Sequence, residues 1–203
     1  MPNTQRRDIV VIGGSAGAVE ALTELLERLP RTVPAAIFVT LHIPSDFPSI
    51  LPEVLSRNGW KARHPQQHEG FERGVILVAP PDLHLMVERE EVTLSRGPRE
   101  NRHRPAIDVM FRSAARAYGP RVVAVLLSGE MDDGSSGMMA VKMRGGLAVV
   151  QNPAEAKASE MPSRAIQNAQ PDCVLSVARI ADLLRSVTSE ELRLAEPAGG
   201  SVS

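Results

Sequence analysis

The sequence predicts an α/β fold: a doubly wound, mainly parallel sheet with helices on both faces and a small antiparallel hairpin. Short continuous apolar runs, typical of strands that are covered on both faces, alternate with longer segments whose apolar residues recur at helical spacing. Glycine or proline ends most of these segments. Strands and helices that alternate in this way form parallel sheets, whose sites lie beyond the carboxyl ends of the strands.

The expected strands are the buried apolar runs. Two glycines end the first run (IVVI), two prolines stop the third (GVILVA), and the most hydrophobic run (VVAVLL) leads into a serine and a glycine. We expect these strands at residues 9–12, 35–41, 74–79, 122–127, 147–150 and 174–177. Residues 83–87 and 92–95 flank four charged residues, which predicts the antiparallel hairpin.

The expected helices lie between these strands. Leucines at positions 22, 25, 26 and 29 share one helical face, and Pro30 follows them. A proline in the first turn starts the third expected helix, and Gly145-Gly146 ends the fourth. We expect helices at residues 19–29, 48–57, 105–118, 135–144, 161–168 and 180–194.

The composition is ordinary for a soluble domain of 203 residues, with 43% hydrophobic and 23% charged residues. Without a linker or a repeat, residues 1–194 are expected to form a single domain, and residues 195–203 a flexible tail. A net charge of −1 and six aromatic residues argue against binding of nucleic acid. No apolar run approaches the ~20 residues of a membrane helix, so the protein is not expected to be membrane-embedded. The single cysteine, Cys173, is expected to be buried and favours a reducing, cytoplasmic location.

Residues 13–17 (GGSAG), at the end of the first strand, fit the G-x-S-x-G pattern of a nucleophile turn. A glycine turn with Ser15 as a helix cap is the simpler alternative. A dinucleotide loop is disfavoured because it needs glycines where Ser15 and Ala18 stand. The serine–acid–histidine order of the α/β-hydrolases is also disfavoured, since the last histidine is His103.

Two other expected strands also end in reactive side chains. His42 follows the second strand; if the first two strands are neighbours, it emerges beside Ser15 and can accept the hydroxyl proton. Residues 128–134 (SGEMDDG) supply a carboxylate that can orient the imidazole. The alternatives are a structural role for His42, Mg²⁺ binding by Asp132 and Asp133, and capping of the next helix by Asp133.

Together these segments resemble the catalytic domain of the chemotaxis receptor methylesterases. The resemblance rests on residues 11–17 (VIGGSAG), 40–44 (TLHIP), 78–84 (VAPPDLH), 101–108 (NRHRPAID), 128–138 (SGEMDDGSSGM) and 161–165 (MPSRA). It implies hydrolysis of methyl esters on glutamate side chains of chemoreceptor cytoplasmic regions, with release of methanol, and deamidation of receptor glutamines. It also implies that Ser15 is the nucleophile, His42 the base and Asp133 the acid that orients His42, with no cofactor and no metal.

The partner implied by the resemblance is a methylated chemoreceptor. Typical family members carry an N-terminal phospho-receiver domain, whereas here the first strand starts near residue 8. The resemblance therefore covers the effector half, and we expect the activity to be constitutive or controlled by a separate regulatory protein.

Four residues depart from the family pattern: Ala18, Leu41, Glu130 and Met131. The family has methionine at the position of Glu130 and glycine at the position of Met131. An inward carboxylate at Glu130 would repel a developing oxyanion. Glu130 and Ala18 motivate an alternative function, a catalytically weak or inactive receptor-binding module of the same fold. His84 and His103 recur in family segments and are expected to be structural unless they lie near Ser15.

Overall fold

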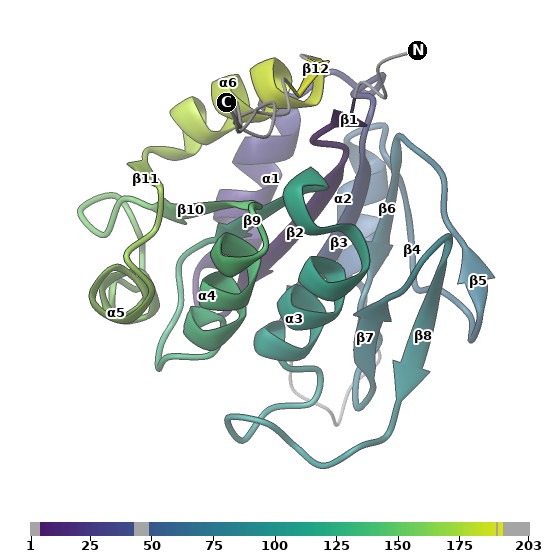
Figure 1. Cartoon of the computed structure of the whole chain (residues 1–203), viewed down its shortest axis with the longest axis horizontal. Helices are drawn as coiled ribbons and strands as arrows, with labels where there is room; N and C mark the ends of the chain where they lie inside the picture. The colour runs from purple at the N-terminus through teal and green to yellow at the C-terminus, as the bar shows by residue number, and fades with distance from the viewer. Residues whose placement is uncertain (1–4, 43–48, 190, 193–203) are drawn as a thin grey trace, which may run out of the picture.

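Strand β2 (Ile9–Gly14) lies inside a parallel sheet of seven strands, ordered β11-β10-β9-β2-β3-β6-β4 (Figure 1). The computed structural model describes residues 5–42, 49–189 and 191–192. The other strands are β3 (Ala36–Leu41), β4 (Lys61–Arg63), β6 (Val75–Val78), β9 (Val122–Leu126), β10 (Leu147–Gln151) and β11 (Cys173–Leu175). The chain builds the sheet outward from β2, first through β3, and returns to the other side of β2 with β9. Such a switch point is where α/β sheets place their sites.

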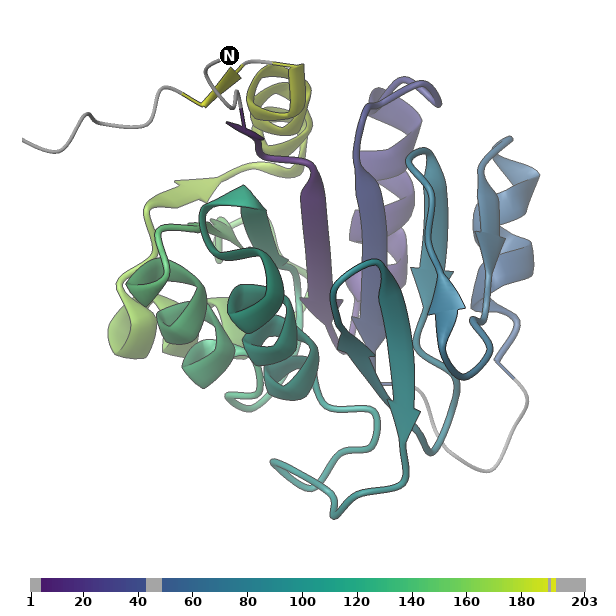
Figure 2. The same cartoon turned by 45° about the vertical axis from the view of Figure 1, so that its right-hand side comes forward.

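Both faces of the sheet are covered by helices, as Figures 1 and 2 show. Val10 and Ile12 of β2 face a core formed with α1, α2 and α6, whereas Ile9 and Val11 face a core formed with α3, α4 and α5. This alternation explains why the strand reads as a continuous apolar run. The helices are α1 (Ala18–Arg28), α2 (Leu51–Arg57), α3 (Ile107–Tyr118), α4 (Ser135–Met143), α5 (Glu160–Ala169) and α6 (Val177–Ser189), and a 3₁₀ turn, Gly119–Arg121, follows α3.

A small antiparallel sheet lies beside α3. It packs through Leu85, Val87 and Val92 against the core that contains α3, α4 and α5. Its order is β5-β8-β7, from β5 (Glu69–Gly70), β7 (His84–Val87) and β8 (Glu91–Ser95). The expected hairpin is therefore confirmed, and β5 extends it to three strands.

The predicted fold class is confirmed, and the differences lie at the periphery. The last helix was expected to reach residue 194, but α6 ends at Ser189, and β12 (Glu191–Leu192) pairs instead with β1 (Gln5–Arg6). Cys173 was expected to be buried, but it is only partly buried because β11 is an edge strand. The expected tail at 195–203, and residue 48 of the second expected helix, lie outside the described residues. In the described part of the chain, no helix has the length and apolar character needed to cross a bilayer.

Candidate active site

Ser15 is the first residue after β2, in the turn that leads into α1. Its N–H donates to the Ser128 carbonyl at 2.9 Å, and its own carbonyl accepts from the Ala18 N–H at 3.0 Å. Gly17 completes the turn with a φ of 74°, a left-handed conformation that glycine adopts without strain. The turn therefore fixes Ser15 at the carboxyl edge of the sheet, directly before the N-terminus of α1.

Residues after β9 support this turn from the neighbouring strand. The buried Ser128 hydroxyl donates to the Ala16 carbonyl at 2.7 Å and accepts from the Ala158 N–H at 2.8 Å. A Cβ at Gly129 would lie 3.0 Å from the Ser15 Cβ and 2.7 Å from the Met161 Sδ, so only glycine fits this position without displacing a neighbour. The backbone around Ser15 is thus packed tightly on this side.

His42 follows β3, the strand on the other side of β2. Gly14 pairs with Leu41 in the parallel register, and the His42 N–H donates to the Gly14 carbonyl at 3.1 Å. Ser15 and His42 are therefore the next residues of two strands that lie about 4.8 Å apart. The expectation that His42 leaves the sheet beside Ser15 depends on these two strands being neighbours. The structure confirms that they are neighbours.

The His42 imidazole contacts the buried Asp133 carboxylate, with 2.8 Å between Nε2 and Oδ2. An ionised carboxylate only accepts hydrogen bonds, so in the neutral ring Nε2 carries the hydrogen and Nδ1 keeps its lone pair. The Nδ1 atom is buried and has no hydrogen-bond partner among the described residues. In the chymotrypsin-type triad it is Nδ1 that faces the acid, so the His42 ring lies in the opposite orientation.

Asp133 is held as an anion in spite of its burial. Burial alone would raise its pKa, but hydrogen bonds from His42, the Ile107 and Asp108 N–H groups and the Asn101 amide lower the pKa below its usual value. Each of the two carboxylate oxygens accepts two of these four bonds, at 2.7 to 3.0 Å. With its lone pairs occupied in this way, Asp133 is not arranged to bind Mg²⁺, and no cluster of three or more His, Cys, Asp or Glu side chains within the described ranges is arranged to hold a metal.

Two helices exchange capping carboxylates at this point. Asp133 precedes α4, yet it accepts from the first two N–H groups of α3. Asp108, in the first turn of α3, accepts from the Gly134 and Gly137 N–H groups at the start of α4, at 3.0 and 2.6 Å. The alternative in which Asp133 caps the helix that follows it is therefore wrong. Helix N-termini carry unpaired N–H groups and favour negative charge, which stabilises both carboxylates.

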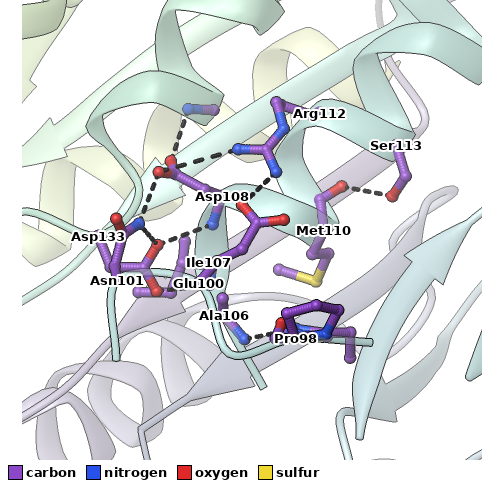
Figure 3. A network of polar contacts seen from close by, with 12 residues as sticks. Pro98, Glu100, Asn101, Ala106, Ile107, Asp108, Met110, Arg112, Ser113 and Asp133 are labelled. Atoms are coloured by element: carbon purple, nitrogen blue, oxygen red, sulfur yellow. Dashed lines mark hydrogen bonds and ion pairs between the residues drawn. The ribbon is translucent and has the colours of Figure 1, made fainter. Parts of the chain in front are cut away.

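Asn101 joins the two carboxylates (Figure 3). Its amide nitrogen donates to Asp133 Oδ1 and to Asp108 Oδ2, both at 2.8 Å. Burial and the nearby charge of Asp133 raise the pKa of Asp108. Sequence reasoning placed Asn101 and Asp108 in a family segment but assigned them no role.

His103 lies against His42. The two rings are stacked, with 3.5 Å between their centroids and 8° between their planes. His103 is expected to be structural unless it lies near Ser15, and the stack places it against His42, the residue that follows the strand beside Ser15. His84 is buried and bonds to the Pro98 carbonyl at 2.9 Å, and its Nδ1 accepts from the Ala106 N–H at 3.2 Å, as a structural histidine does.

The departures from the family pattern have different surroundings. Ala18 and Leu41 are buried in the core shared with α1. Glu130 is exposed, so its charge is solvated. Met131 has a φ of 67°, in the left-handed region that glycine adopts without strain. The family pattern has glycine at this position.

Comparison with known proteins matches most of the chain to one family. The model of the CheB methylesterase domain matches residues 10–184. A protein-glutamate methylesterase/protein-glutamine glutaminase of Methanosarcina mazei is 32% identical over 88% of this chain and 51% of its own length. One from Anaeromyxobacter dehalogenans is 39% identical over 95% of this chain and 53% of its own length. The chain thus spans about half the length of these two relatives.

A solved structure agrees in fold. The crystal structure of the CheB methylesterase catalytic domain of Thermotoga maritima superposes with a TM-score of 0.83 at 30% identity, over 88% of this chain and 97% of that one. The family model extends over the strands, turns and helices that carry Ser15, His42 and Asp133. On this evidence the chain belongs to the CheB methylesterase family.

Proposed function

We propose that the protein is a serine hydrolase that removes methyl esters from glutamate side chains of chemoreceptors in the cytoplasm, and that it also deamidates glutamine side chains. Residues 1–194 act as a single catalytic domain in this proposal. Ser15 is the nucleophile, His42 the general base and Asp133 the acid that orients His42. The names of the relatives supply the substrate class, protein glutamate and glutamine side chains.

One observation carries the assignment of the residues. Asp133 fixes the hydrogen of His42 on Nε2, at 2.8 Å, and leaves the lone pair of Nδ1 unpaired among the described residues. His42 leaves the sheet next to Ser15, through the pairing of Gly14 with Leu41. A base with a free lone pair, oriented by a buried carboxylate and next to a serine, is the arrangement that activates a hydroxyl nucleophile.

The first half of the reaction forms an acyl-enzyme. The Ser15 Oγ attacks the ester carbonyl carbon while its proton passes to His42 Nδ1. Backbone N–H groups in the turn from Ser15 into α1 stabilise the oxyanion; the Ala18 N–H is not among them, because it donates to the Ser15 carbonyl. The tetrahedral intermediate then collapses, and methanol leaves with the proton from His42.

The second half restores the enzyme. Water attacks the acyl carbon, gives its proton to His42, and the glutamate carboxylate leaves as Ser15 Oγ regains a proton. With a glutamine substrate the same steps release ammonia in place of methanol. Asp133 stays ionised throughout, as its lowered pKa requires, and stabilises the positive charge on His42.

Ser15→Ala tests the proposal. Methanol release from a methylated receptor fragment is expected to fall by at least about 10⁴-fold, since removal of a triad nucleophile leaves only binding and oxyanion stabilisation. Ser136→Ala is the matched control, because Ser136 is exposed on α4 and should release methanol at the wild-type rate. Both variants should unfold at the wild-type temperature.

The same assay addresses the alternative of a receptor-binding module. Wild-type protein that binds the methylated receptor but releases neither methanol nor ammonia would establish that function instead. The solvent exposure of Glu130 favours the hydrolase, because a solvated carboxylate repels an oxyanion far less than an inward one.

A further inference from the structure

The turn at Glu100–His103 brings two side chains to His42 and Asp133 from outside the three proposed triad residues. Glu100 and His103 exchange backbone hydrogen bonds of 3.1 and 2.8 Å. Between them, Asn101 and Arg102 have φ values of 50° and 70°. Two left-handed residues closed by such a pair of bonds match a type I′ turn, a tight and well-defined conformation.

Ion pairs hold the turn on both sides. Glu100 pairs with Arg112 of α3, a contact that Figure 3 also shows. Arg104 donates to Asp82 Oδ1 through two nitrogens, at 2.9 and 2.7 Å. The turn is thus linked to α3 by one ion pair and to the segment before β7 by the other.

Asn101 acts on the carboxylate side. Its amide supplies one of the four hydrogen bonds to Asp133 and a bond to Asp108, both at 2.8 Å. The bridge offsets the repulsion between two buried carboxylates and fixes the plane of the Asp133 carboxylate. That plane sets the direction of the bond to His42 Nε2.

His103 acts on the imidazole side. The parallel ring, 3.5 Å away, blocks rotation of the His42 ring out of its plane and excludes water from that face. The His103 Nε2 atom is buried and has no hydrogen-bond partner among the described residues, so the stack is not a by-product of polar contacts at this atom.

The charge state of His103 suits this role. Burial and the nearby His42 lower its pKa, as do Arg99 and Arg102, and only Asp133 acts in the other direction. His103 therefore stays neutral near pH 7 and presents no like charge when His42 takes up a proton.

We propose that Asn101 and His103 are positioning residues for the hydrolysis, with Asn101 fixing the Asp133 carboxylate and His103 fixing the plane of the His42 ring. The proposal rests on the proposed function, because it assigns these two residues to the same reaction. Neither residue touches the reacting atoms; both act through the side chains that do.

Four variants of the full chain test the proposal by kcat and KM for methanol release. His103→Leu keeps bulk but removes the flat ring, and His103→Phe restores the ring without its nitrogens. Asn101→Gly keeps the left-handed turn and removes the amide. Arg102→Gly makes the same backbone change at the next position, where the exposed side chain takes no part in either contact. The signal of the His42 ring in ¹H–¹³C NMR spectra reports the stack independently of activity.

We expect His103→Leu to lower kcat by about 10- to 100-fold and Asn101→Gly by about tenfold, with KM within about threefold of the wild type, because small misplacements of reacting groups act on kcat. His103→Phe and Arg102→Gly should keep kcat within about threefold. The His42 signal should shift in His103→Leu, from the loss of the neighbouring ring current, and stay unchanged in Arg102→Gly.

Wild-type kcat in both His103→Leu and Asn101→Gly overturns the proposal. So does a rise in KM at constant kcat, which would assign the turn to substrate contact, or an equal loss of kcat in His103→Phe and His103→Leu. Failure of the proposed function itself is distinct: the wild-type protein would then release no methanol, whatever the variants do.

Discussion

At the scale of single residues, the proposed chemistry depends on which nitrogen of His42 faces Asp133. The contact of Nε2 with Oδ2 at 2.8 Å leaves Nδ1 as the atom that accepts the Ser15 proton in the proposed reaction. The sequence identified the three residue types and the strand ends that bring them together. It could not identify the ring orientation, because that depends on where the Asp133 carboxylate lies, and Asp133 is placed by the N-terminus of α3 rather than by its own loop.

The same reason explains why Asn101 and His103 were missed. Both contacts depend on a turn whose two central residues have positive φ. Asparagine is common at the first of these positions, but Arg102 stands where glycine is usual. Asparagine followed by arginine, rather than by glycine, does not predict a type I′ turn. The only signal in the sequence was their presence in the segment 101–108 shared with the family.

Asp133→Asn tests the role of the acid. We expect kcat for methanol release to fall by about 10⁴-fold, because an amide that donates to Nε2 stabilises the wrong tautomer of His42. Asp132→Asn is the matched control, since Asp132 is the exposed neighbour, and it should retain wild-type kcat. Comparable losses in both variants would contradict the assignment of Asp133.

At the scale of elements, the N-termini of α3 and α4 are coupled through their exchanged carboxylates. Asp133 satisfies N–H groups of α3, and Asp108 satisfies N–H groups of α4. The site is therefore built on two helix starts that fix each other, which gives the Asp133 carboxylate a rigid support. The helices themselves were predicted within a few residues, since their apolar periodicity is strong.

Asp108→Ala tests this coupling. Loss of the α4 cap is expected to lower the free energy of unfolding by about 1–2 kcal/mol in urea titrations. Ser135→Ala is the control within the same helix start, because the buried Ser135 hydroxyl has no partner among the described residues. It should leave stability within about 0.5 kcal/mol of the wild type, and a larger loss than in Asp108→Ala would contradict the account.

The elements that were not predicted are short or polar. β4 (Lys61–Arg63) is an edge strand with exposed charged ends, which alternating hydrophobicity does not reveal. β5 and β12 have two residues each and depend on partners far away in the sequence. The apolar pattern beyond Ser189 continued to indicate a helix, whereas the backbone there pairs with residues 5–6.

At the scale of the whole molecule, charge pairs tie the beginning of the sheet to distant segments. The buried Asp8, just before β2, accepts from Arg121 at 2.8 and 2.9 Å and from Arg73 at 2.7 Å. Burial would raise the pKa of Asp8, but the hydrogen bonds of these two arginines lower it below its usual value. Both arginines belong to connections that precede strands of the central sheet, β6 and β9.

The ion pairs of Asp8 with Arg73 and Arg121 predict that the stability of the protein depends on pH. Because the pKa of Asp8 is lower in the folded chain, its contribution is complete above the unfolded pKa of about 3.9 and is lost as pH falls through the folded pKa. Asp8→Asn should therefore be less stable than the wild type by about 2 kcal/mol at pH 7. The difference should shrink below about pH 4. Thermal unfolding of both proteins from pH 2 to 7 measures it, and a difference that stays constant over this range would contradict the prediction.

The central claim, that Ser15 is activated by His42 and Asp133, is tested most directly by reaction of the full chain with a fluorophosphonate, followed by mass spectrometry of its peptides. The account predicts a single phosphonyl adduct on Ser15, which forms much more slowly in Asp133→Asn and is absent in Ser15→Ala. An adduct on another residue, or no adduct in protein that does release methanol, would contradict it.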